Sequence, residues 1–200
     1  MKPKQMLPFR LYLLLTILYP FIPAQAQKVH FGIKAGAVYS NISFKAVDPI
    51  VDTDKKASAT FGFFVHIPFN GRLSLRPSVE YVSKGAFTNE LFLGIYPNRT
   101  KIQLSYLEIP VNLLYEWPLK RNKLLAGGGP VVSFLLNKQY GGQGYDNYDL
   151  GLNVLAGYEF ALGVSFCLNF TRGFKNVVTR KMNGESIKNY CYGVTIGYWF

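Results

Sequence analysis

Apolar side chains recur at every second position in eight separate runs of this sequence, and this pattern limits the fold more than any other feature. In the last run, 190–200, tyrosine, valine, isoleucine and phenylalanine occupy every even-numbered position. Alternation with a period of two predicts β-strands that have one apolar and one polar face. No helical periodicity of useful length separates the runs, so the sequence predicts an all-β protein. The other runs are 29–39, 59–67, 72–84, 101–117, 123–136, 149–160 and 164–172, and glycines leave the faces of 123–136 open.

The segments between the expected strands alternate in length. Short turns are expected at 69–71, which carries the strong hairpin signal Asn70-Gly71, and at 118–122 and 161–163. Short turns at one end and long loops at the other are typical of a transmembrane up-and-down antiparallel β-barrel, and eight strands enclose an interior that side chains fill. A hairpin hidden in the first long segment would instead give ten strands. The long polar segments are 41–58, 85–100, 137–148 and 173–189.

A soluble up-and-down barrel of the lipocalin kind has the same periodicity but buries its apolar face inside. Two features favour the membrane barrel. Charged residues interleaved with glycines on the polar face suit a crowded lumen, and aromatic residues near the strand ends suit the two membrane interfaces. These aromatic residues are Tyr39, Tyr81, Tyr115, Trp117, Tyr158, Tyr198 and Phe200.

The first 26 residues have the three parts of a secretory signal peptide. Residues 1–10 carry three basic residues and no acid, 11–23 are apolar, and 24–26 read AQA. Small residues at Ala24 and Ala26 predict cleavage before Gln27. A membrane anchor helix is the alternative, but thirteen residues interrupted by two prolines fall short of the roughly 20 needed to span a bilayer. We therefore expect a signal peptide over 1–26 and a barrel domain over 27–200.

The chain is basic, with a formal net charge of +11. Export argues against nucleic acid as the partner, and the basic residues are scattered over the expected loops rather than along a helix face. Such loops suit anionic lipid headgroups or glycans, so outer-membrane lipid and lipopolysaccharide are the expected partners. A role in solubility alone would explain the same charge.

Four motifs resemble one known family. They are FGIKAGAVYSN at 31–41, YLEIPVNLLY at 106–115, GGGPVVSFLL at 127–136 and DLGLNVLAGYEF at 149–160. Together with the aromatic last residue they resemble the PorT-like outer-membrane β-barrel proteins of Bacteroidota, over essentially all of the mature chain. The resemblance implies a place in the Gram-negative outer membrane, and the signal peptide predicts export through the Sec pathway. It implies no single activity, because the founding member is linked to type IX secretion whereas others are only called porin-like.

Charged residues of both signs share the polar face. Buried charges persist only when they are paired and hydrogen-bonded, so three acids and three bases predict a sealed polar core. The alternative is a narrow pathway for ions or small solutes along the same residues. The acids are Glu80, Glu108 and Glu159, and the bases are Lys34, Arg76 and Lys84.

Catalytic and metal-binding patterns are weak. His30 and His66 are expected near the periplasmic ends of adjacent strands, but two histidines without a third ligand make a poor metal site. The sequence has no GxSxG, HExxH or phosphate-binding loop. We therefore expect no catalytic residue, no metal and no cofactor, and we expect that the protein is not an enzyme.

Both cysteines are expected on the lumen face of the last two strands. Cys167 and Cys191 are equally far from residue 179, so a hairpin centred there would place them opposite each other. The periplasm is oxidising enough for a disulfide between them. Two free buried thiols are the alternative.

The final strand is expected to pair with the first and so leave no free edge. Its lipid-facing residues and terminal aromatic resemble the signal by which the barrel-assembly machinery selects its clients. The function expected of the whole is that of a structural, interaction or secretion-accessory component that acts through its extracellular loops on an envelope partner. A narrow porin-like channel for small solutes is the alternative. The signal residues are Tyr192, Val194, Ile196, Tyr198 and Phe200.

Overall fold

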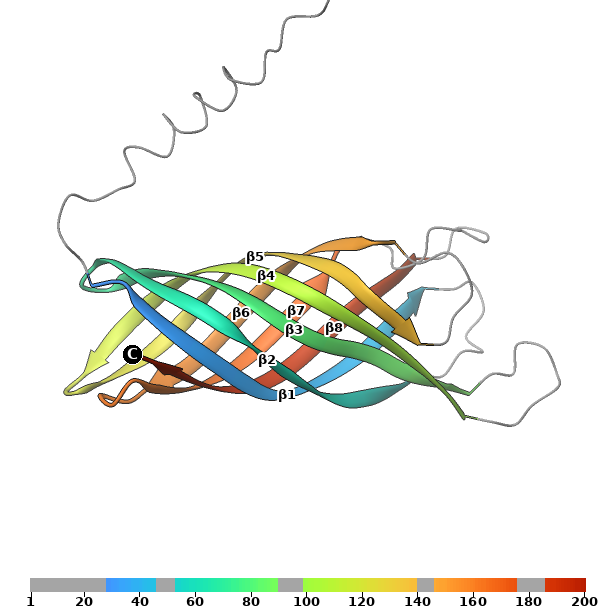
Figure 1. Ribbon diagram of the computed structural model, residues 1–200, viewed down its shortest axis with the longest axis horizontal. Coiled ribbons are helices and arrows are strands. Elements are labelled where there is room, and N and C mark those ends of the chain that lie inside the picture. The colour runs from blue at the N-terminus through green and yellow to red at the C-terminus, as the bar shows by residue number, and fades with distance from the viewer. Residues whose placement is uncertain (1–27, 46–52, 90–98, 140–145, 176–185) are drawn as a thin grey trace, which may run out of the picture.

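The computed structural model describes residues 28–45, 53–89, 99–139, 146–175 and 186–200. Eight strands within these ranges form one closed barrel in which each strand pairs with its sequence neighbours and β8 pairs with β1 (Figure 1). All pairings are antiparallel, which confirms the predicted all-β, eight-stranded fold. The expected signal peptide lies outside the described residues. The strands are β1 (His30–Lys45), β2 (Thr53–Asn70), β3 (Leu73–Asn89), β4 (Arg99–Leu119), β5 (Asn122–Gln139), β6 (Tyr148–Glu159), β7 (Val164–Gly173) and β8 (Ser186–Trp199).

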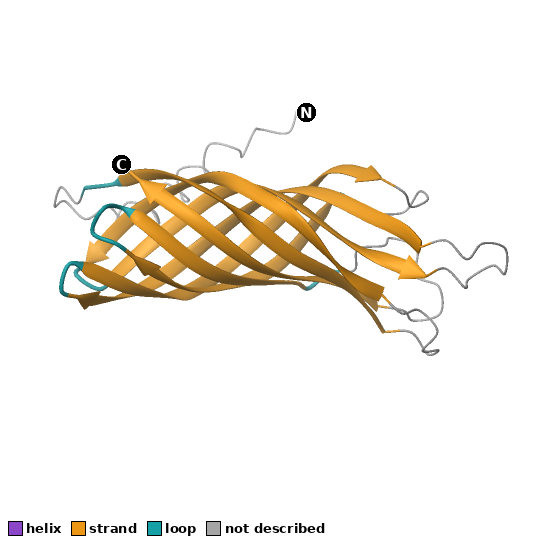
Figure 2. Cartoon of the chain, turned by 90° about the horizontal axis from the view of Figure 1, so that it is seen from below, coloured by secondary structure: helices purple, strands orange, loops and turns teal. Residues whose placement is uncertain are grey.

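One end of the barrel carries three tight turns and the C-terminus, and the other end carries the four longer connections (Figures 1 and 2). The turns fall where the sequence predicts them. Asn70 pairs with Leu73, so only two residues link β2 to β3. Between β6 and β7, Gly163 has a φ of 85°, a backbone conformation that glycine adopts without strain.

The strands continue farther into the long connections than the sequence predicts. Ser40 pairs with Lys56, and β1 and β2 both extend beyond that pair into the expected 41–58 loop. The alternation of apolar residues fades there because these strand ends no longer face hydrocarbon, although the backbone pairing continues. Since β1 and β2 are direct neighbours, the ten-stranded alternative is wrong.

The closing seam between β1 and β8 runs from the Gly32–Trp199 pair to the Lys45–Ser186 pair. Phe200 N also donates to Phe31 O over 2.8 Å. A closed ladder leaves no unpaired strand edge, and a backbone that crosses hydrocarbon requires this because no water is available there.

Apolar side chains point outward and polar ones inward. Phe63 is 68% exposed, whereas the next residue, Phe64, is 3% exposed. On β4 the same contrast holds for Trp117 on the outside and Glu116 on the inside. An apolar outer face is the arrangement of a membrane barrel and the reverse of a lipocalin. No helix among the described residues is long and apolar enough to cross a membrane.

The barrel is longer than a membrane is thick. β4 has 21 residues. At a rise of about 3.3 Å per residue and a tilt of about 45°, it covers about 49 Å along the barrel axis, against an apolar band about 25 Å tall. The wall therefore continues well beyond the bilayer, at the end that carries the longer connections.

Candidate functional site

The lumen holds the residues that the sequence singles out. At the turn end lies a group that we call the turn-end cluster: His66, Ser74, Arg76, Glu116 and Glu159. Arg76 Nη2 lies 2.8 Å from Glu159 Oε2, and Ser74 Oγ donates to Glu116 Oε1 over 2.5 Å. All five residues are buried, so the carboxylates are neutralised and hydrogen-bonded without access to bulk water.

The hydrogen bonds fix the state of His66. Arg76 Nη2 lies 3.3 Å from His66 Nδ1, and a guanidinium can only donate, so Nδ1 accepts. Nε2 then carries the ring proton and donates toward Glu116 Oε1, 3.3 Å away. His30 pairs with His66 across the ladder, but its ring stacks near Trp199, with centroids 4.2 Å apart. Within the described residues, no group of three or more His, Cys, Asp or Glu side chains is arranged to hold a metal ion.

Farther into the barrel, Lys34 Nζ lies 2.5 Å from Glu80 Oε1. Ser78 Oγ donates to the same carboxylate oxygen over 2.7 Å. Below this pair the Arg76 guanidinium lies over the Phe64 ring, 5.0 Å from its centroid. The Phe64 ring fills space that only glycine leaves open, because a Cβ on Gly32 would come within 2.3 Å of it.

Toward the end with the long connections, Lys84 pairs with Glu108. Both residues are buried, and Ser133 Oγ donates to Glu108 Oε1 over 2.8 Å. Lys84 Nζ also lies 5.6 Å from the centroid of the Tyr106 ring. The structure thus brings together all six predicted lumen charges as three ion pairs at three depths.

Two parts of the lumen were not anticipated from the sequence. Glu116 appears on the expected polar face, but its partners His66 and Lys123 were not identified; Lys123 Nζ lies 2.8 Å from Glu116 Oε2. Apolar side chains also fill the interior between the ion pairs. The sequence could have indicated them, because a residue that lies an even number of positions from a lumen residue on the same strand shares its face. They form two groups: Leu114, Leu125 and Leu155 with Cys167, and Val38 and Val82 with Cys191.

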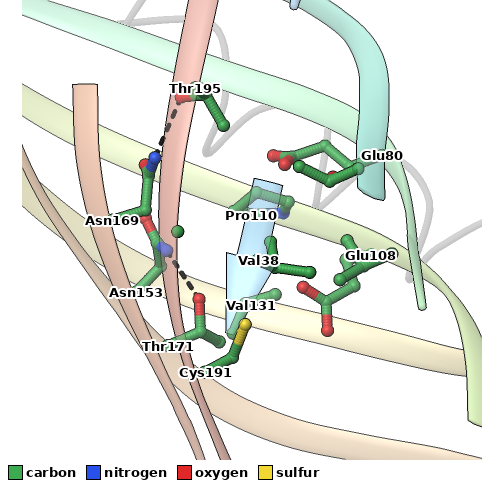
Figure 3. A pocket seen from close by; sticks show the side chains of 13 residues that line it. Val38, Glu80, Glu108, Pro110, Val131, Asn153, Asn169, Thr171, Cys191 and Thr195 are labelled. Atoms are coloured by element: carbon green, nitrogen blue, oxygen red, sulfur yellow. Dashed lines mark hydrogen bonds between the residues drawn. The ribbon is translucent and has the colours of Figure 1, made fainter. Parts of the chain in front are cut away.

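These side chains leave little free space. One lumen cavity has a volume of about 30 Å³ and is lined by Val38, Glu80, Glu108, Cys191 and nine other residues (Figure 3). The second, nearer the turn end, has about 20 Å³. A single water needs about 10–15 Å³ of such volume, so each cavity holds one or two waters. Around the larger cavity, Asn153 donates to Thr171 and Asn169 donates to Thr195, which ties three strands together.

A closed eight-stranded barrel with an apolar exterior and a packed, charged interior has counterparts among known proteins. The family described as outer membrane protein beta-barrel domain matches residues 24–198. The chain belongs to this family. It is therefore a protein of the Gram-negative outer membrane, as the sequence predicts.

Solved structures of outer-membrane proteins share this fold. OprG from Pseudomonas aeruginosa is 13% identical with a TM-score of 0.56, and the match covers 87% of this chain and 97% of that one. Neisserial surface protein A is 15% identical with a TM-score of 0.50, and the match covers 87% of this chain and 100% of that one. Identities this low show a common fold alone. No curated protein gives a significant sequence match.

The two cysteines of this outer-membrane protein are both buried and free. The predicted disulfide is wrong, because Cys167 pairs with Thr195 in the ladder and Cys191 pairs with Thr171. Four residues along a strand amount to about 13 Å, far more than a disulfide spans. The β7–β8 pairing is centred two residues later than residue 179, the centre that would set the cysteines opposite each other, and this shift separates the thiols.

The outer face of β8 is apolar and faces the bilayer. The predicted assembly-signal residues Tyr192, Val194, Ile196, Tyr198 and Phe200 all lie on it and are exposed on the barrel surface.

At the end of the barrel that carries the long connections, just beyond β7, Lys175 Nζ lies 3.1 Å from Asp146 Oδ2 and 3.5 Å from the centroid of the Tyr148 ring. Desolvation lowers the pKa of Lys175, but the hydrogen bonds and charge interactions with Asp146 and Tyr148 together outweigh it and raise that pKa above its usual value.

Proposed function

We propose that this outer-membrane protein is a closed, non-conducting barrel that acts through its extracellular connections on a partner in the cell envelope. The observation that carries the proposal is the filled lumen. Three ion pairs at three depths alternate with apolar side chains, and the two cavities between them have about 30 and 20 Å³. A hydrated ion needs a continuous aqueous path, and isolated spaces of this size do not provide one.

The architecture places the available interaction surface at one end. The wall projects beyond the bilayer there, and the four long connections leave from it. The segment after β7 is the most basic of them in sequence, with four basic residues against one acid between 174 and 189. An acidic surface or glycan is the partner chemistry that such a segment favours. More narrowly, we propose that the protein is a PorT-like secretion-accessory component. We also propose that it catalyses no reaction.

Planar-bilayer recording on protein extracted from outer membranes tests the closed lumen. We expect no steady current from the wild-type barrel. A porin of known conductance, recorded in the same bilayers, is the positive control, because emptying one end of this barrel would leave the Lys34–Glu80 and Lys84–Glu108 layers in place. Heat-modifiable gel migration verifies that both samples are folded. Steady wild-type conductance would refute the sealed barrel and favour the narrow channel instead.

Chemical crosslinking of intact cells tests the partner. We expect one dominant envelope protein to be captured by the wild-type chain. Replacing the four basic residues between 174 and 189 with glutamine should reduce that capture, while the same number of lysine-to-glutamine changes elsewhere should not. An unchanged capture pattern would show that this segment is not the contact.

A further inference from the structure

The outer wall carries an apolar groove across β2, β1 and β8. Ala35 forms its floor, with Phe61 and Phe63 on one side and Ile196 and Tyr198 on the other. Ile33, between Phe63 and Tyr198, closes the groove on the side of the turn end. Its volume is about 430 Å³. The flanking residues are all strongly exposed; Phe61 is 57% and Ile196 is 51% exposed. The bulky side chains therefore stand out from the wall as two ridges with a valley between them.

Small residues continue the valley toward the extracellular side. Ala37 pairs with Ala59, and Tyr39 pairs with Ala57, all on the outward face. Along β1 the floor therefore follows the order Ala35, Ala37, Tyr39. Four residues amount to about 13 Å along the strand and about 9 Å along the membrane normal at a tilt of about 45°. The run of small residues is therefore shorter than one leaflet, and the exposed Tyr39 side chain ends it on the side of the long connections.

A cation stands at the extracellular end of this valley. Lys55 Nζ lies 5.8 Å from the centroid of the Tyr39 ring and 5.9 Å from that of the Tyr192 ring. Tyr39 and Tyr192 are a cross-strand pair on β1 and β8, so the two rings form a platform under the ammonium group. Tyrosines at this depth mark the boundary between hydrocarbon and headgroups. Lys55 therefore projects where the phosphates of outer-leaflet lipids lie.

We propose that this groove, with Lys55 at its end, is a binding site for a phosphate-bearing glycolipid of the outer leaflet. One acyl chain lies along Ala35 and Ala37 between the aromatic and aliphatic ridges. A phosphate of the headgroup sits against the Lys55 ammonium group, and the rings of Tyr39 and Tyr192 support the sugar edge. Alanine floors suit an acyl chain because a larger side chain would fill the valley, and lysine binds phosphate as a point charge.

A second copy of the chain is a poorer occupant. A two-fold contact through this face would bring the ridge aromatics against each other and would draw two Lys55 ammonium groups into the same interface. Like charges that approach in a low dielectric are destabilising, whereas an anionic lipid neutralises the charge. The groove lies on the outer wall, so this proposal does not depend on whether the lumen conducts.

A second groove on the same barrel provides an internal comparison. It has about 470 Å³ and is lined by Ala126 and Ala156 between Trp117, Leu124, Phe166 and Leu168. It matches the first groove in size and apolar character, and its Phe166 pairs with Ile196 of the first groove, but its lining includes no cation. Substitutions there control for any general effect of altering an alanine-floored outer surface.

Native mass spectrometry of the detergent-solubilised protein with diphosphoryl lipid A tests the proposal. We expect bound lipid on the wild-type protein, with Lys55→Gln weakening it about five-fold, the value of about one lysine–headgroup attraction. Ala35→Leu should weaken it several-fold by filling the valley. Ala156→Leu in the second groove and Lys120→Gln at the exposed turn should leave binding unchanged, and heat-modifiable migration checks that every variant is folded.

Four results would overturn the proposal. Equal binding of lipid A by wild type and Lys55→Gln would remove the headgroup contact. Equal effects of Ala35→Leu and Ala156→Leu would show unspecific lipid adhesion. A wild-type dimer that Ala35→Leu dissociates would identify a second copy as the occupant. We expect that inorganic phosphate alone does not compete with lipid A for the site. Competition by phosphate would contradict the acyl-chain contact.

Discussion

Removing one member of the Lys84–Glu108 pair should destabilise the barrel strongly. Lys84 is 3% and Glu108 is 5% exposed, so neither charge can regain its hydration when its partner is lost. Breaking a buried pair by deleting one partner costs about 3–5 kcal/mol. Glu108→Leu also removes the acceptor for Ser133, which adds about 1 kcal/mol. We therefore expect the free energy of unfolding to fall by about 4–6 kcal/mol in Glu108→Leu and by about 3–5 kcal/mol in Lys84→Met.

The double variant separates burial of an unpaired charge from loss of packing. Replacing both members with Lys84→Met and Glu108→Leu removes the uncompensated charge, so its loss should be within about 1–2 kcal/mol of wild type. Urea unfolding in lipid vesicles, followed by heat-modifiable gel migration, gives the four stabilities of the double-mutant cycle. Lys175→Met is the matched control, because both side chains of its pair with Asp146 are partly exposed, at 32% and 24%, and the pair should be worth under about 1 kcal/mol. Single-variant losses as small as this control would show that water reaches the lumen, and they would refute the sealed core.

Three further predictions concern packing, geometry and the thiols. Gly32→Val should lower the yield of folded barrel sharply, as judged by heat-modifiable migration, because its side chain would overlap the Phe64 ring; folding at wild-type yield would contradict that packing. Arg76→Lys should lose about 1–2 kcal/mol in urea unfolding, since a lysine cannot keep both of the arginine's hydrogen bonds and its ring contact. Cys167 and Cys191 should both react with a thiol reagent after unfolding without reductant, as read by mass spectrometry; two unreactive thiols that reductant releases would restore the disulfide.

Much of this fold follows from a single physical constraint that is visible in the sequence. A strand with one face in hydrocarbon and one in a packed lumen must alternate, so runs such as 149–160 predicted both the strand and its faces. The three ion pairs followed from the same logic, because buried charges of opposite sign require each other. Lys34 meets Glu80, Arg76 meets Glu159 and Lys84 meets Glu108.

What the sequence did not predict depends on register and on the depth of the membrane. The Cys167–Cys191 pairing failed because alternation fixes a face but not the residue that lies opposite. The extra length of β1 and β2 was missed because apolar alternation stops at the membrane surface, whereas the ladder does not. The lipid-facing groove depends on side chains from three strands, so it becomes visible only once Ala35 is placed between Phe61 and Ile196.

The seam between β1 and β8 determines when this protein can exist in the membrane. β1 pairs with both β2 and β8, so a chain that lacks β8 would expose a row of unpaired amides and carbonyls to hydrocarbon. Each such group costs several kcal/mol. No stable intermediate with fewer strands can wait in the bilayer alone. The exported chain must be kept unfolded until β8 is available, and closure then completes the barrel in one step. We therefore expect a chain that lacks β8 to fail before insertion rather than in the membrane.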